Sequence, residues 1–132
     1  MLPVTINTLR IFLHLLAVAI WVGGMLTLAG LVGTVRQLGD DAPRRVARQF
    51  NRLAWPAYAV VWATGIWNVL SVDLTAVSLQ YQITLGVKLV LVLASGIAAF
   101  LHAEVSSRVV LAIGGVVAAA GALGAMFLGV ML

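Results

Sequence analysis

Four long apolar runs, separated by short polar connections, dominate the pattern of hydrophobic and polar positions along this chain. The runs cover Ile11–Val35, Leu53–Leu70, Ile83–Leu101 and Val109–Leu132. Each is close to the roughly 20 residues that an α-helix needs to cross the hydrocarbon core of a bilayer. Since lipid offers no partner to an open backbone, helices are the expected spanning elements. The pattern predicts an all-α integral membrane protein, a four-helix bundle that forms a single domain over residues 1–132.

The helices are expected at about residues 6–35, 42–71, 80–104 and 107–132. Asp40 and Asp41 offer a capping carboxylate for the second helix, and Pro43 suits its first turn. Pro56 lies inside the same helix and has no N–H for the carbonyl four residues earlier. A kink at Pro56 is therefore predicted.

Composition strengthens the membrane assignment. Of 132 residues, 63% are hydrophobic and only 9% are charged, which is typical of a chain whose solvent is lipid. Cysteine is absent, so disulfides and thiolate metal sites are excluded. A metal ligand would have to be a histidine, a methionine, a carboxylate or a backbone carbonyl.

The basic residues predict how the chain is oriented. Arginines crowd the connection between the first two helices (Arg36, Arg44, Arg45, Arg48 and Arg52), and Arg108 lies in the connection between the last two. By the positive-inside rule both connections are cytoplasmic. We therefore expect a multi-pass protein of the cytoplasmic (inner) membrane, with both termini on the outer, periplasmic side. The net charge of +4 is read as contact with anionic lipid and not with nucleic acid.

Two ionisable residues lie deep inside apolar runs, where they are costly and point to function. With each run centred on the bilayer midplane, His14 falls roughly 12 Å and Lys88 roughly 6 Å to the outer side. Trp67, Asn68 and Met126 fall roughly 9 Å to the same side. We therefore expect these residues to share one outer-leaflet site, together with Trp21. His102 falls roughly 15 Å toward the cytoplasm, too far away to join His14 around one metal ion.

Each candidate has a structural and a functional interpretation. His14 fits a hydrogen bond to a neighbouring helix, an axial haem ligand or a copper ligand. Lys88 fits snorkelling to the headgroups or a counter-charge for an anionic ligand. The tryptophans, Trp21 and Trp67 among them, fit interfacial anchoring or the lining of a flat ligand. Met126 fits apolar packing or a soft ligand for Cu(I).

The last helix carries small residues at four-residue spacing, which let helices approach closely. One stripe holds Gly114, Ala118 and Ala122, and an overlapping one holds Gly121, Ala125 and Gly129. Three partners fit this face: another helix of the same bundle, a second copy of the chain, and a larger membrane complex.

Several segments resemble the CopD copper-resistance domain family. They are 13–16 (Leu-His-Leu-Leu) with 21–24 (Trp-Val-Gly-Gly), 48–54 (Arg-Gln-Phe-Asn-Arg-Leu-Ala) with 64–65 (Thr-Gly), and 81–91 with Lys88. The resemblance extends to about residue 104. It implies copper handling at the cytoplasmic membrane. The candidate metal ligands are then His14 and, as a soft donor outside the matching segments, Met126.

The same chain is similar to the HemJ-type protoporphyrinogen oxidase family. The matching features are His14, the Trp55-Pro56 pair and Lys88. This resemblance implies haem b, with His14 as an axial ligand and Lys88 in the haem site.

Three functions are thus expected, with copper or another metal handled in a CopD-like manner placed first. The second is a haem b protein acting in porphyrin oxidation or electron transfer, so the cofactor is copper or haem b. The third is a ligand-free accessory subunit that binds a larger membrane complex. Whether the chain is an enzyme is left open.

Overall fold

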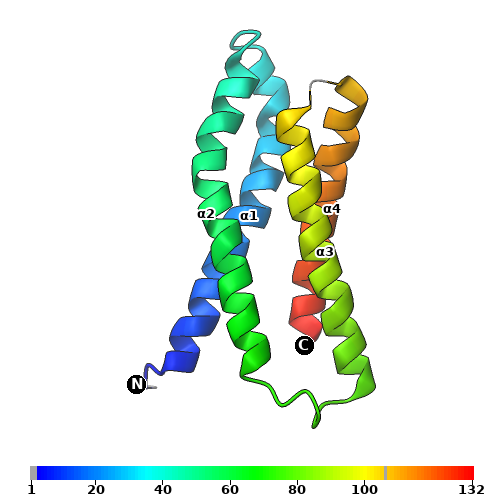
Figure 1. Ribbon diagram of the computed structural model, residues 1–132. Helices are drawn as coiled ribbons and strands as arrows, with labels where there is room; N and C mark the ends of the chain where they lie inside the picture. The colour runs from blue at the N-terminus through cyan, green and yellow to red at the C-terminus, as the bar shows by residue number, and fades with distance from the viewer. Residues whose placement is uncertain (1–2, 106) are drawn as a thin grey trace. The chain divides into compact units, whose positions relative to one another are not determined.

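The computed structural model describes residues 3–105 and 107–132, and within them it contains helices and no strand. The helices are α1 (Ile6–Arg36), α2 (Ala42–Leu70), α3 (Leu79–Glu104) and α4 (Arg108–Met131), as Figure 1 shows. All four are long and apolar enough to cross a membrane. The prediction of an all-α chain with four apolar, membrane-compatible helices is confirmed.

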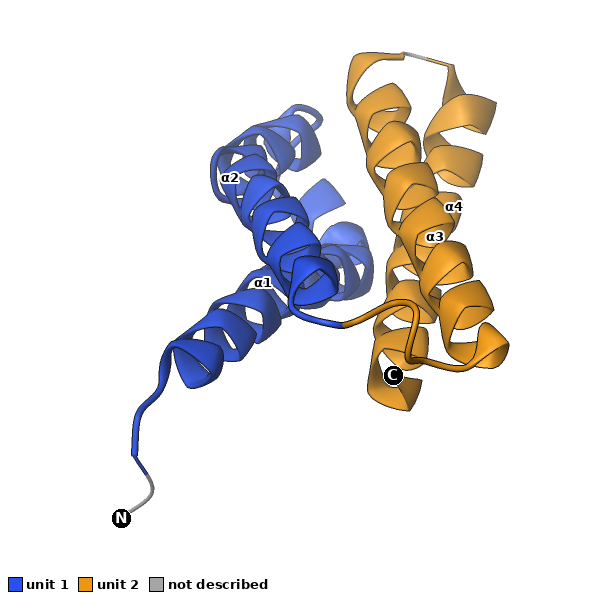
Figure 2. Cartoon of the chain, turned by 60° about the horizontal axis from the view of Figure 1, so that its bottom comes forward, with its two compact units in different colours: residues 1–72 blue, residues 73–132 orange. Residues whose placement is uncertain are grey.

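Contacts divide the chain into two compact units, coloured separately in Figure 2. Unit 1 is Met1–Val72 and contains α1 and α2; unit 2 is Asp73–Leu132 and contains α3 and α4. In each unit two antiparallel helices pack against one another. The single four-helix domain, the periplasmic termini and the kink stay predictions; α2 runs as one helix through Pro56.

Side-chain caps fix the starts of α1 and α3. The Thr5 hydroxyl accepts the Thr8 N–H at 3.2 Å, and the Ser78 hydroxyl accepts the Tyr81 N–H at 3.2 Å. The expected carboxylate cap of α2 is wrong: Asp41 is the N-cap residue but makes no side-chain cap bond. Its backbone is helical (φ −97, ψ −3) instead of extended, and the extended form is the one usual for a capping side chain. Pro43 does stand in the first turn, as predicted.

Alanines and aromatic rings fill the interior of unit 1. Ala17 and Trp21 of α1 are buried, as are Ala54 and Ala57 of α2. Near the α1–α2 connection, the Phe50 ring lies over Gly24, where a Cβ would collide with it. Gly24 therefore gives the ring its space on α1.

Small residues bring α3 and α4 close together in unit 2. The buried residues of α4 are Gly114, Ala118, Gly121, Ala122 and Ala125. A Cβ added at Gly121 would lie 3.1 Å from the Leu91 carbonyl oxygen, and the Ser95 hydroxyl donates to the Ala118 carbonyl at 2.7 Å. Of the three partners that fit the small-residue face, the structure thus shows a neighbouring helix of the same chain.

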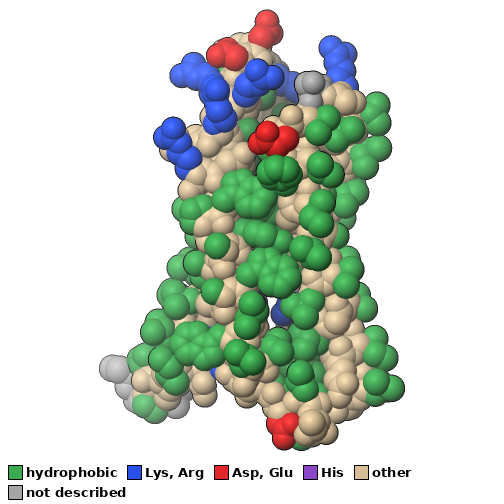
Figure 3. Space-filling model, viewed as in Figure 1, with side chains coloured by type: hydrophobic (Ala, Val, Ile, Leu, Met, Phe, Trp, Pro, Cys, Tyr) green, Lys and Arg blue, Asp and Glu red, His purple; other side chains and the backbone are tan. Residues whose placement is uncertain are grey.

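Large apolar side chains cover the outside of both units. Leu15 is 61% exposed, Val90 65% and Phe127 67%. Figure 3 shows hydrophobic side chains along the helices, with charged ones gathered toward the ends. Such a surface is suited to contact with the acyl chains of a bilayer.

Candidate functional site in unit 1

His14 is held across the α1–α2 seam by a hydroxyl. Its Nδ1 lies 2.8 Å from Thr64 Oγ1, in a part-buried contact. Beside this contact, a Cβ on Gly65 would lie 3.5 Å from His14 Cε1, an ordinary contact distance. The Thr64 hydroxyl thus makes a polar contact with the imidazole, and Gly65, which has no side chain, leaves room beside it.

The Thr64 hydroxyl determines which imidazole nitrogen carries hydrogen. Thr64 Oγ1 lies 2.6 Å from the Val60 carbonyl oxygen, which can only accept. The hydroxyl hydrogen is committed to that carbonyl, so Oγ1 must accept from His14, and Nδ1 is protonated. In the neutral imidazole the lone pair then belongs to Nε2. This arrangement is how proteins orient a metal-ligating histidine.

A second polar contact links the two helices toward the start of α1. Arg10 Nη1 donates to the Ser71 hydroxyl, which donates to the Trp67 carbonyl at 2.8 Å. Arg10 precedes His14 by one helical turn, so both lie on the same face of α1. On α2, Asn68 lies between Thr64 and Ser71 on one face by the same spacing. We call Arg10, His14, Thr64, Asn68 and Ser71 the polar seam.

Of the residues predicted for the site, His14 and Asn68 belong to the polar seam. Trp67 contributes its carbonyl to the seam, whereas the residue as a whole is 41% exposed.

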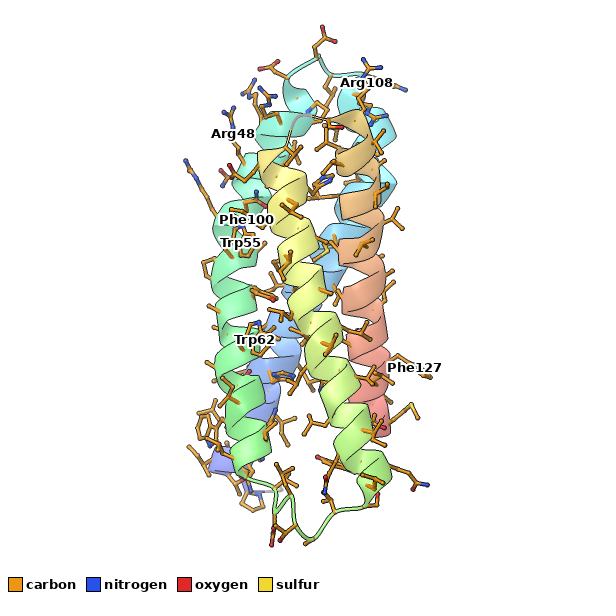
Figure 4. The ribbon with its side chains drawn as sticks, turned by 45° about the vertical axis from the view of Figure 1, so that its right-hand side comes forward. Arg48, Trp55, Trp62, Phe100, Arg108 and Phe127 are labelled. Carbon is orange, nitrogen blue, oxygen red and sulfur yellow. The ribbon has the colours of Figure 1, made fainter. Side chains whose placement is uncertain are left out.

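Trp21 is buried two turns further along α1, in an aromatic cluster. Its ring centroid lies 5.6 Å from that of Trp55 and 4.5 Å from that of Tyr58. Tyr58 also contacts Trp62 at 6.3 Å, edge to face. Figure 4 labels Trp55 and Trp62 on α2. The cluster thus joins α1 and α2 by ring contacts, further toward the α1–α2 connection than the polar seam.

Lys88 and Met126 belong to unit 2, so their place in a shared site with His14 stays a prediction. Lys88 is half-buried, and a Cβ on Gly129 would lie 3.0 Å from its Nζ. Gly129 is in the last turn of α4, where unbonded carbonyls carry partial negative charge that favours a cation. Met126 is 47% exposed on the same helix.

His102 has a structural role at the other end of unit 2. Its Nδ1 donates to the Leu111 carbonyl at 2.6 Å and so joins the end of α3 to the start of α4. No group of three or more His, Cys, Asp or Glu side chains that could hold a metal ion occurs among the described residues.

Thr64 is the residue that the sequence interpretation did not select for the site. The spacing along the chain could have identified Thr64. Gly39 lies in the turn between α1 and α2, with φ 137, and it is equally far along the chain from His14 and from Thr64. In an antiparallel hairpin, residues equally far from the turn lie at the same level. A hydroxyl at the level of a membrane histidine is a ready partner.

Comparison of the chain with family models, with curated proteins and with solved structures finds no significant match. The similarities to the CopD and HemJ families therefore stay interpretations of the motifs.

Proposed function

We propose that this protein is a haem b-binding membrane protein in which His14 Nε2 supplies an axial ligand to the iron. It would take part in electron transfer or porphyrin oxidation. The observation that carries the proposal is the contact from His14 Nδ1 to Thr64 Oγ1, whose own hydrogen goes to the Val60 carbonyl. This contact leaves the metal-binding lone pair on Nε2.

The number of ligands favours haem b over copper. The porphyrin supplies four nitrogens itself, so one histidine is a sufficient protein ligand. A copper ion bound by side chains alone needs several soft or imidazole ligands. In unit 1, His14 has a hydroxyl neighbour in the polar seam and an aromatic cluster two turns away. Sites for cofactors are lined mainly by apolar and aromatic side chains with a few polar groups.

Copper handling is the alternative drawn from the CopD-like segments. It would require thioether ligands such as Met126, which lies in unit 2. The two proposals differ in what accompanies the protein on purification, so one experiment separates them.

The test is an absorption spectrum of the protein purified in mild detergent, recorded oxidised and then dithionite-reduced, with metal analysis of the same sample. We expect a Soret band and sharpened bands on reduction. His14→Ala should abolish them. His102→Ala, which removes the only other histidine, should leave them unchanged, because His102 bonds the Leu111 carbonyl in unit 2.

Two results would overturn the proposal. A spectrum without haem bands, obtained even after haem is added to the purified protein, would exclude haem b; stoichiometric copper in that sample would support the CopD-like function. Equal haem content in the His14→Ala and wild-type proteins would show that His14 is not the ligand.

A further inference from the structure

A basic hollow lies on α2, near the α1–α2 connection. It has a volume of about 350 Å³ and is lined by Arg45, Arg48, Gln49 and Arg52. Cavities that bind small molecules in proteins are about 300–1,000 Å³, so this one lies at the lower end. Figure 3 shows Lys and Arg side chains gathered at this end of the molecule, and Figure 4 labels Arg48 there.

The helical register places these four side chains on one face. At about 100° per residue they fall within an arc of about 100°. All four are exposed. Phe50 lies on the other side of the helix, since its ring packs over Gly24 of α1. The basic face is therefore directed away from α1.

The charge on this face is not neutralised by nearby acids. Residues 36–52 include five arginines and two aspartates, Asp40 and Asp41. Among the residues that the structure describes, the lining arginines make no ion pair. Guanidinium groups match phosphate geometry in bidentate fashion, and Gln49 adds amide donors. The hollow therefore has the donors and the charge for a phosphate ester.

The same face continues as an exposed apolar strip further along α2. At alternating spacings of three and four residues, Arg52 is followed by Pro56, Ala59, Ala63 and Ile66, all exposed. Most of these side chains are small, so few atoms project from this face of the helix. A phosphate group on the arginines would bring an attached acyl chain onto this strip.

We infer that this face is a binding site for an anionic phospholipid, with the phosphodiester in the basic hollow and an acyl chain on the strip. A free phosphate would use the hollow alone. The apolar continuation favours the lipid, and so does the position of the arginines at one end of an apolar helix long enough to span a membrane.

The experiment is native mass spectrometry of the full chain in detergent, titrated with phosphatidylglycerol and, separately, with phosphatidylcholine. We expect one phosphatidylglycerol to bind more tightly than phosphatidylcholine. Arg48→Gln/Arg52→Gln should weaken its binding about 25-fold, since each basic group near an anionic headgroup contributes roughly fivefold.

The matched control is Arg36→Gln/Arg44→Gln, which removes the same charge outside the hollow. Arg44 is on the same helix but about 90° from the centre of the basic face. This variant should bind phosphatidylglycerol within about twofold of wild type. Equal losses in the two variants would overturn the inference, because they would show a response to net charge alone.

A competition experiment separates the lipid from a soluble phosphate. Glycerol phosphate should not displace bound phosphatidylglycerol, because it has no acyl chain for the strip. Displacement by glycerol phosphate at a similar concentration would overturn the lipid assignment and leave a phosphate site. Circular dichroism of both variants verifies that their helices are intact.

Discussion

The two helix pairs solve the same packing problem in different ways. In unit 1, polar side chains bridge the helices, as His14 does to Thr64 and Arg10 to Ser71, and aromatic rings fill the space between them. In unit 2, small residues of α4 allow close backbone approach, with the Ser95 hydroxyl bonded to the Ala118 carbonyl. Contact between small residues stabilises a pair of helices in lipid, where apolar burial drives association only weakly.

The difference indicates a division of labour. A seam of ionisable and hydroxyl groups is expensive inside a membrane and is normally retained for function. A seam of glycine and alanine contributes packing, and these side chains have no polar or ionisable group that could bind a ligand or transfer a proton. Unit 1 is thus the candidate for the functional part and unit 2 for a structural part, with Lys88 as the residue of unit 2 that departs from this division.

The largest expected effect is a loss of stability in unit 2, where the small residues of α4 lie against α3. We call this contact the close seam. Gly121→Leu places a Cβ 3.1 Å from the Leu91 carbonyl oxygen and adds three further carbons. Overpacking costs typically about 1–3 kcal/mol, and backbone cannot move aside, so we expect about 3 kcal/mol or more. Thermal unfolding in detergent, followed by circular dichroism, measures the loss.

Gly86→Leu is the matched control, because Gly86 is on α3 and a Cβ there meets nothing within 4 Å. It should be neutral or slightly stabilising, since leucine is a better helix former than glycine. If both leucine variants unfold at the wild-type temperature, the close contact of α3 with α4 does not stabilise unit 2.

The next effect concerns the polar seam of unit 1. Thr64→Val keeps the shape but removes the oxygen that accepts the Nδ1 hydrogen of His14. Loss of such a supporting bond typically lowers affinity about 10–100-fold, and we expect this for haem titrated into the cofactor-free protein. Thr64→Ser retains the hydroxyl and should bind haem like wild type. Equal affinity in the valine variant would argue against a fixed tautomer.

A smaller effect is expected for the single hydroxyl in the close seam. Ser95 is fully buried and its bond to Ala118 crosses between helices. Interhelical hydrogen bonds in membranes contribute about 0.6 kcal/mol on average, so Ser95→Ala should destabilise by about that amount. Thr27→Ala removes a bond within one helix, from Thr27 to the Gly23 carbonyl, and should have less effect on unfolding. Identical unfolding of the serine variant and wild type would show that packing alone holds the seam.

The smallest expected effect is on the pKa of Asp73, in the connection between α2 and α3. The Thr75 hydroxyl donates to the Asp73 carboxylate at 2.6 Å, and the Thr75 N–H donates to it at 2.9 Å. These bonds, the hydroxyl's first, hold the pKa of Asp73 below its ordinary 3.8. This contribution to the turn is present above pH 3.8 and is lost as the pH falls through the lowered pKa. Thr75→Val should raise the pKa toward 3.8, as measured by carboxyl NMR titration. An unchanged pKa would assign the shift to backbone donors.

Much of the fold follows from the sequence because apolar run length and local signals determine where membrane helices form. Pro43 and the polar connections mark helix positions without reference to the rest of the chain. The faces in contact are harder to predict, because helices that are apolar on most sides can rotate with little change in hydrophobic burial. The sequence therefore marked Thr64 only as part of a Thr-Gly pair in a family-like segment and did not identify it as the partner of His14.

Pro56 has a consequence for local opening of α2. Because proline has no N–H, the carbonyl of Arg52 lacks its usual partner four residues later. The missing bond interrupts the backbone ladder between the basic face and the segment with Thr64. We expect the two halves of α2 to open separately, and amide hydrogen exchange should show protection changing at Pro56. Opening of the half that carries the basic face would then leave Thr64, the partner of His14, in place.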